Sequence, residues 1–172
     1  AYRYAAEKGH TGSRWALANM YADGDGVQEN DLEAFKIYSE IAQAGVELHY
    51  PAPDPGLRVE ANKGQLQQVI LNLAFNSLSA MPQGGRLTVT CAGEATAHGR
   101  VVLVDLADTG TGIPEPIRAR VFESFLSGRG DGTGLGLAIA ARIMKDHRGE
   151  LAILRTGPLG TTMRLTLPLT SG

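Results

Sequence analysis

Two asparagines, Asn72 and Asn76, stand four residues apart in a long amphipathic segment. The apolar residues of 64–81 recur at helical spacing, so the two amides should lie one turn apart beside the buried face of a helix. Neutral amide oxygens can serve as ligands for Mg²⁺, which takes its other ligands from phosphates and water. For either amide alone, a cap for a neighbouring loop is the better explanation. The buried stripe of this helix is expected to comprise Leu66, Val69, Ile70, Leu73 and Ser77.

A carboxylate and two glycines, Asp108, Gly110 and Gly112, follow an apolar segment that is typical of a strand. An aspartate at a strand end can accept a hydrogen bond from an exocyclic amine, and glycines let a planar ring approach the backbone closely. By itself the pattern is also that of an ordinary strand-to-helix turn.

A glycine-rich run at 130–137 leads into a second predicted helix at 135–146. Glycine backbone next to a helix N-terminus offers N–H donors and a positive dipole end to phosphate groups. The run is not a P-loop, because no Gly-Lys-Ser/Thr follows, and the G-x-G-x-x-G spacing of a dinucleotide fold is absent. A glycine loop without a ligand is the alternative.

In their order and spacing, these motifs resemble the boxes of the catalytic and ATP-binding domain of sensor histidine kinases, which belong to the GHKL superfamily. Residues 68–77 resemble the N box, 108–112 the first glycine box and 132–137 the second. The segment 121–125 looks like the F box, and 160–168 is similar to the closing strand. The turn at 80–85 resembles that of the nitrogen-regulator type.

The resemblance implies a single site for Mg-ATP. Asn76 would ligate Mg²⁺ with Asn72 assisting, and Asp108 would bind the adenine amine. An ATP lid would cover 115–133, with two phenylalanines anchoring its base and Arg129 near the γ-phosphate. A histidine at position 147 is common in the family, but a structural role explains it better. The implied nucleotide-binding residues are Asn72, Asn76, Asp108, Gly110, Gly112, Ile113, Phe122, Phe125, Arg129, Gly132, Thr133, Gly134, Leu135, Gly136, Leu137 and Thr162.

The reaction that the resemblance implies is transfer of the γ-phosphoryl group to a histidine on a separate dimerisation domain, and through it to a response regulator. The chain has four histidines, and none has the sequence context of that acceptor. Related ATPases and anti-sigma serine kinases have a glutamate base where Asn72 stands. An amide cannot abstract a proton from water, so these alternatives are disfavoured.

Residues 1–45 have a different pattern, with apolar residues at helical spacing around an Asp-Gly-Asp-Gly turn. Residues 2–9 resemble residues 38–45 in sequence, at an offset of 36 residues, which is typical of stacked helix pairs. The segment resembles Sel1-like repeats and, more loosely, the rhizobial periplasmic regulator of exopolysaccharide synthesis. Because about three repeats are needed for stability, it is expected either to dock on a partner or to be an artificial fusion. A partner-binding scaffold is therefore an alternative function.

The expected fold is an α/β sandwich, a mixed sheet packed on helices, in a domain spanning 46–172. Strands are predicted at 46–50, 57–61, 86–91, 101–107, 150–154 and 161–167. The net charge of −2 argues against binding to nucleic acid or an anionic membrane, and the single cysteine excludes an internal disulfide. No apolar segment approaches the ~18 residues that span a bilayer. A cytoplasmic domain is expected, and the start at Ala1 suggests a fragment or a processed chain.

Overall fold

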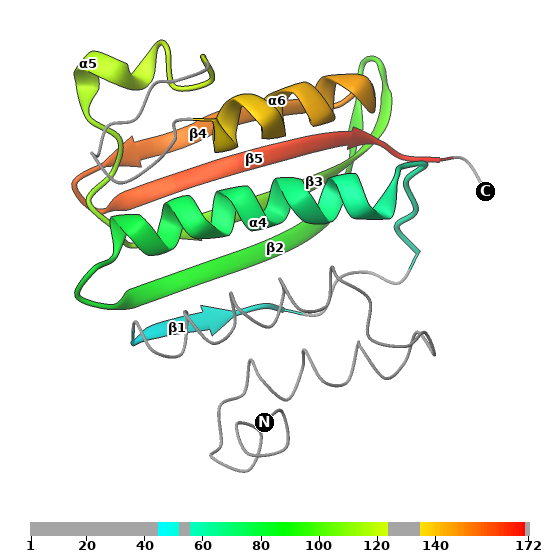
Figure 1. Cartoon of the computed structure of the whole chain (residues 1–172). Coiled ribbons are helices and arrows are strands. Elements are labelled where there is room, and N and C mark those ends of the chain that lie inside the picture. Colours follow the sequence, from blue (N-terminus) through cyan, green and yellow to red (C-terminus); the bar gives the residue numbers. More distant parts are fainter. Residues whose placement is uncertain (1–44, 52–55, 124–134, 171–172) are drawn as a thin grey trace.

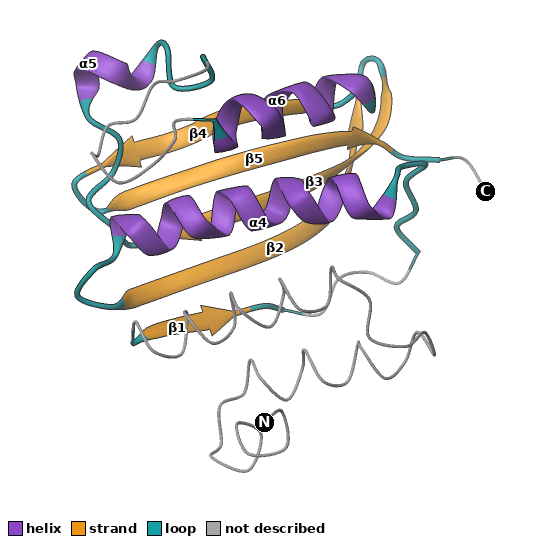
Figure 2. Cartoon of the chain, in the orientation of Figure 1, coloured by secondary structure: helices purple, strands orange, loops and turns teal. Residues whose placement is uncertain are grey.

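A computed structural model of the chain describes residues 45–51, 56–123 and 135–170. Five strands form one sheet in the order β1-β2-β3-β5-β4. Helices α4 and α6 lie side by side on one face of this sheet, as Figure 1 and Figure 2 show. The elements are β1 (Val46–His49), α4 (Lys63–Ala80), β2 (Gly85–Thr96), β3 (Gly99–Asp108), α5 (Glu115–Arg118), α6 (Gly136–Asp146), β4 (Glu150–Gly157) and β5 (Gly160–Pro168).

The sheet is mixed, as expected. The edge strand β1 pairs in parallel with β2, and the other three pairings are antiparallel. A parallel pair needs a crossover connection, and α4 supplies it between β1 and β2. The two central antiparallel pairings hold β3 between β2 and β5, so the end of β3 is fixed on both sides.

Helix α4 begins at Asn62, whose side-chain oxygen accepts a hydrogen bond from the backbone N–H of Gln65 at 3.0 Å. This is the usual way in which an asparagine satisfies a free N–H at a helix start. The helix buries Val69, Leu73 and Ser77, as predicted from the sequence. Ile70 does not belong to the buried stripe, because 38% of it is exposed.

The core lies between the two helices and the sheet. In β3 and β5 alternate residues point to this face, and burial alternates from Met163 to Leu167 in β5 and over the last residues of β3. The opposite face carries an ion pair in which Arg164 donates two hydrogen bonds of 2.7 Å to Asp105. That hydrogen bonding raises the pKa of the Arg164 guanidinium. The least exposed side chains are Leu73, Met81, Leu87, Leu106, Met144 and Val69.

The strand predicted at 57–61 does not form. Leu57 and Val59 are half-buried and their neighbours are exposed, so the alternation of a strand is present. However, the segment joins no strand of the sheet, and the carbonyl of Arg58 instead accepts hydrogen bonds from the backbone and hydroxyl of Thr170. The expected helical segment at 1–45 and the glycine-rich run up to residue 134 lie outside the described residues, apart from Gly45.

Candidate functional site

Helices α4 and α6 are joined by hydrogen bonds near both ends of α6. At its start, the side-chain amide of Asn72 donates to the carbonyl of Gly136 at 3.0 Å. At its end, the backbone N–H of Asn62 donates to Nε2 of His147 at 3.0 Å, and Nδ1 of that ring lies 2.8 Å from the carbonyl of Ile143. The imidazole therefore carries its proton on Nδ1 and has both nitrogens engaged. These contacts give His147 a structural role and place the first turn of α6 beside Asn72.

Asp108 ends β3 and is 5% exposed. Its Oδ1 accepts hydrogen bonds from the backbone N–H of Gly110 at 2.9 Å and of Thr161 at 3.0 Å. Its Oδ2 accepts from the hydroxyl of Ser77 at 3.1 Å. An ionised carboxylate has about four acceptor positions, and these donors take three of them. Among the described residues no other donor is recorded on Oδ2, so one of its acceptor positions remains for a ligand such as an amine.

The glycines around Asp108 are required by the packing of the protein itself. A Cβ on Gly110 would lie 2.6 Å from the carbonyl oxygen of Ala80, at the end of α4. A Cβ on Gly112 would lie 2.2 Å from the carbonyl oxygen of Gly157, and Gly112 also has a φ of 75°. The loop after Asp108 therefore fits closely between α4 and the β4–β5 turn. From the sequence, these glycines are expected only to let a planar ring approach, so their role in packing is a finding of the structure.

Gly136 differs from these glycines. A Cβ at this position would meet Asn72 at 3.7 Å, which is ordinary van der Waals contact. The protein itself therefore does not require glycine at the start of α6. The contact of its backbone with the phosphates, which the resemblance implies, stays a prediction.

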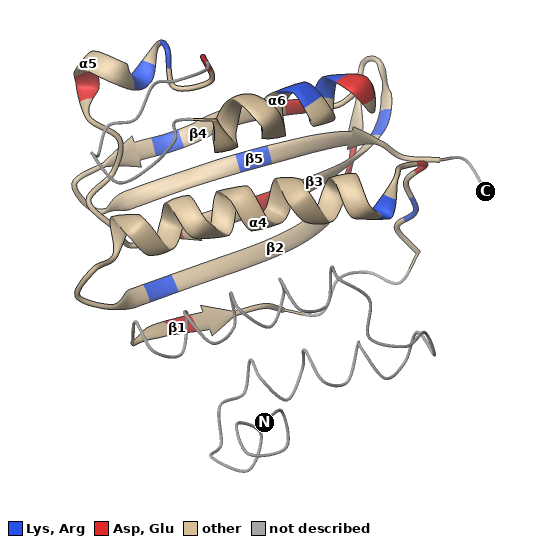
Figure 3. Ribbon diagram, in the orientation of Figure 1, with Lys and Arg blue, Asp and Glu red and all other residues tan. Residues whose placement is uncertain are grey.

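Asn76 is exposed on α4, one turn after the half-buried Asn72. The helix carries one charged residue, Lys63 at its start, and no acidic residue (Figure 3). In the described part of the chain, no group of three or more His, Cys, Asp or Glu side chains could hold a metal ion. A metal at this site would therefore need the negative charges of a bound phosphate chain.

Two hydroxyls on the β4–β5 hairpin extend the bonding around the loop. Thr156 Oγ1 accepts from the backbone N–H of Ile113 at 2.8 Å and lies 2.9 Å from Thr161 Oγ1. Thr161 is on the helix-facing side of β5, whereas Thr162 points to the opposite face and pairs with Ala107. Thr162 is 7% exposed, and its implied contact with the nucleotide stays a prediction.

The described part of the lid consists of α5 and the turns after it. Arg118 donates from its guanidinium to the carbonyl of Ile113 at 2.9 Å, which ties α5 to the loop after Asp108. Val121 is buried and Phe122 packs against the core. Leu135 is half-buried, and Leu137 also packs against the core. Phe125, Arg129, Gly132, Thr133 and Gly134 lie outside the described residues, so their implied contacts remain predictions.

An apolar cavity of about 340 Å³ lies elsewhere, against the first half of α4. Leu66, Val69 and Cys91 contribute to its wall, and none of the expected nucleotide-binding residues does. Burial raises the pKa of the Cys91 thiol. The candidate site is therefore the loop region around Asp108 and the start of α6, and not this cavity. No helix among the described residues is long and apolar enough to cross a membrane.

Comparison with known proteins shows relatives in sequence and in fold. Residues 61–171 match the family model of the histidine kinase-, DNA gyrase B- and HSP90-like ATPases. Sporulation kinase D of Bacillus subtilis is 35% identical over 137 residues, which are 78% of this chain and 26% of that protein. The exopolysaccharide production negative regulator of Rhizobium meliloti matches at the N-terminus, with 94% identity over 47 residues, 27% of this chain and 18% of that protein. The chain thus spans about a quarter or less of these curated relatives.

Two solved structures share the fold. The catalytic domain of histidine kinase ThkA superposes with a TM-score of 0.68 at 26% identity, over 81% of this chain and 89% of that one. Full-length ShkA in complex with AMPPNP gives a TM-score of 0.67 at 27% identity, over 86% of this chain and 31% of that one. The chain therefore belongs to the histidine kinase-, DNA gyrase B- and HSP90-like ATPase family, and within that family it carries the ATP-binding catalytic domain of a histidine kinase.

Proposed function

We propose that this domain binds Mg-ATP between the loop after Asp108 and the start of α6, and donates the γ-phosphoryl group to a histidine of a separate dimerisation domain. The observation that carries the proposal is the single open acceptor position on the buried Asp108 carboxylate, beside a closely packed glycine loop. That position suits the amine of adenine. Because ATP is its substrate, the domain is expected to work in the cytoplasm. The phosphorylated histidine would then pass its phosphoryl group to a response regulator.

The two asparagines would have different roles near the phosphates. Asn72 donates one N–H of its amide to the carbonyl of Gly136, so it holds the start of α6, and its oxygen would be the group that contacts a metal or a water. Asn76 is exposed and would supply the amide ligand of Mg²⁺. Bound Mg²⁺ would neutralise charge on the transferring phosphoryl group. Both side chains are neutral, so they offer no general base for water, and slow hydrolysis is expected.

The described histidines do not suit the role of acceptor. His147 stands eleven residues after Gly136 on α6, about 16 Å along the helix, and both of its nitrogens are engaged. His49 is on the edge strand, and His98 is in the β2–β3 turn. In-line transfer needs the acceptor within a few ångströms of the γ-phosphate. The acceptor is therefore expected on another domain.

Titration calorimetry tests the binding step, with ADP or a non-hydrolysable ATP analogue in excess Mg²⁺. One site per chain is expected, and no heat at millimolar ligand would refute the proposal. Labelled ATP tests the transfer step. The chain alone should gain no acid-labile, base-stable label, whereas an added dimerisation domain from a matching kinase should become labelled on its own histidine. Label on the isolated chain would show that the acceptor lies within it.

A second function, binding of a protein partner, is favoured by the short N-terminal match to the exopolysaccharide regulator. A Sel1-like segment of this kind next to a kinase domain also supports a fusion of two proteins. Removal of residues 1–44 separates the two functions. Nucleotide binding should survive the removal, and its loss would show that the segment belongs to the ATP-binding domain.

A further inference from the structure

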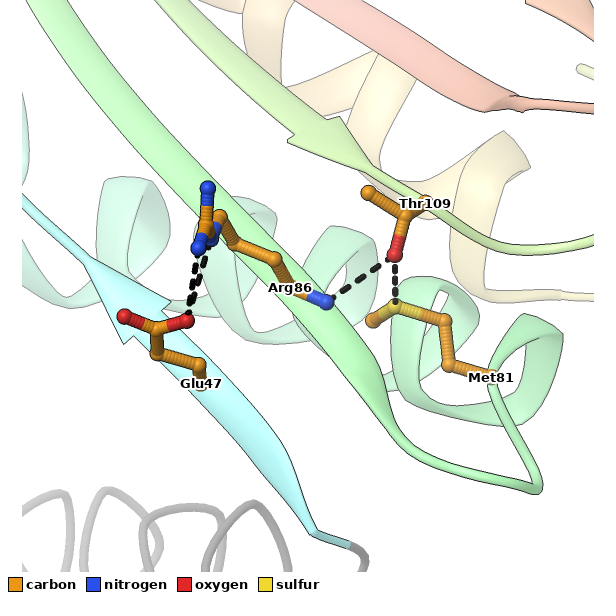
Figure 4. A network of polar contacts seen from close by, with 4 residues as sticks. All are labelled: Glu47, Met81, Arg86 and Thr109. Atoms are coloured by element: carbon orange, nitrogen blue, oxygen red, sulfur yellow. Dashed lines mark hydrogen bonds and ion pairs between the residues drawn. The ribbon is translucent and has the colours of Figure 1, made fainter.

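The side chain of Thr109 takes the place of a backbone acceptor where the glycine loop leaves the sheet (Figure 4). The last regular pair of β2 and β3 joins Leu87 to Asp108. At the next step the N–H of Thr109 still donates to the carbonyl of Arg86 at 3.1 Å. In return, the N–H of Arg86 donates to the Thr109 hydroxyl at 2.9 Å, not to a carbonyl. The backbone is thus free to turn away while the N–H of β2 stays paired.

The same hydroxyl connects the loop to the end of α4. It donates to the sulfur of Met81 at 3.6 Å, and Met81 is 2% exposed at the C-cap of the helix. Gly85 leaves room for this contact, since a Cβ there would lie 2.6 Å from Thr109 Oγ1 and 2.8 Å from Met81 Sδ. The turn at 80–85 therefore packs around the side chain of Thr109 and is more than a mark of family type.

Two further contacts run between the same elements. The N–H of Thr111 donates to the carbonyl of Ala80 at 3.1 Å, and Ser77 donates to Asp108. The loop is thus attached to α4 at three points, on both sides of Gly110. Asn76, which is on the same helix, is adjacent to Ser77 in sequence.

We propose that Thr109 is a positioning residue for adenine recognition. Its hydroxyl fixes the position of the loop after β3 relative to α4. The open acceptor of Asp108 and the amide of Asn76 can then contact the same nucleotide. The inference rests on the proposed adenine role of Asp108. Thr109 acts through Asp108 and does not itself touch the base, since its hydroxyl is engaged with Arg86 and Met81.

The variant Thr109→Val keeps the shape of the side chain and removes both hydrogen bonds. Its affinities for ADP and for inosine diphosphate, which carries a carbonyl in place of the adenine amine, are compared by calorimetry. We expect the preference for ADP to fall roughly five-fold, the effect of one net hydrogen bond, and Thr109→Ser to restore it. Thr90→Val, a change at an exposed threonine of β2, is the matched control and should keep the wild-type preference.

The ratio of the two affinities separates positioning from stability. A purely structural role would lower the melting temperature and weaken both nucleotides equally, and that result would overturn the inference. A wild-type ratio in Thr109→Val would overturn it as well. If Thr109→Val fails to fold, Thr109→Ser still decides, because loss of the preference with the hydroxyl present contradicts the proposal. Failure of the wild-type chain to bind ADP would instead refute the proposed function itself.

Discussion

Replacement of Asp108 with asparagine tests the site at its centre, because it exchanges one oxygen for an NH₂ group without changing the shape of the side chain. Two backbone N–H groups, from Gly110 and Thr161, point at Oδ1 and require an oxygen there. The new NH₂ group must therefore occupy the Oδ2 position, where the hydroxyl of Ser77 can rotate to accept from it. The fold keeps its hydrogen bonds, while the acceptor offered to adenine becomes a donor.

The size of the effect follows from the loss of one hydrogen bond to a charged group. Such a bond is worth about 1.5–3 kcal/mol, which corresponds to roughly 10- to 150-fold in affinity. We expect ADP to bind more weakly by this factor in Asp108→Asn. Inosine diphosphate presents a carbonyl to the new NH₂ group, so the preference for ADP should shrink or reverse.

Calorimetry with both nucleotides in excess Mg²⁺ measures this change, and thermal unfolding checks the fold. The control is Asp105→Asn, which removes a carboxylate of the same strand whose partner, Arg164, is on the opposite face of the sheet. It should leave both affinities unchanged. If Asp108→Asn binds ADP with the wild-type affinity and the wild-type preference, the carboxylate does not recognise the base.

Three further predictions concern other parts of the domain. Asn76→Ala should remove most of the Mg²⁺ dependence of ATP binding with little loss of stability, since the side chain is exposed; an unfolded variant would show a structural role instead. Gly112→Ala should lower the free energy of unfolding by ~2–4 kcal/mol, because of the positive φ of Gly112 and the clash with Gly157. Gly136→Ala should instead keep or raise the stability and weaken ATP binding. Denaturant titration measures both stabilities. Equal stability losses at the two glycines would contradict this contrast. Because burial raises the pKa of Cys91, its thiolate fraction at pH 8 is reduced, so iodoacetamide should alkylate it more slowly in the folded protein than in urea, at a rate that rises with pH. Equal rates in the two states would refute the burial of this thiol.

Local sequence patterns were sufficient for the main elements of the fold. The helix predicted at 64–81 is observed at Lys63–Ala80, because its apolar period and its Asn62 cap are local features. The alternation at 57–61 predicted a strand that does not form, since pairing depends on a neighbouring strand that the pattern cannot reveal. Strand β2 extends to Thr96, beyond the predicted end, through a hairpin in which the Thr96 hydroxyl bonds to both His98 and Gly99.

The site was predictable where the residue type itself suggests the chemistry. The carboxylate of Asp108 and the amides of Asn72 and Asn76 could be singled out in this way. The hydroxyl of Ser77 and the backbone N–H of Thr161 could not, because such groups occur throughout cores and strands. Their role depends on contacts with Asp108 across 31 and 53 residues of sequence.

The parallel pairing of β1 has a consequence for how neighbouring domains are attached. Val46 pairs with Gly85, so the first residue of β1 lies at the same end of the sheet as the last residue of β3. Two strand spacings separate it from Thr109, about 10 Å across the sheet. A domain joined ahead of Gly45 would therefore be tethered at the same end of the sheet as the proposed nucleotide site. A short tether at that point raises the effective concentration of an attached acceptor near the γ-phosphate to the millimolar range, so transfer within one chain would need little intrinsic affinity between the domains.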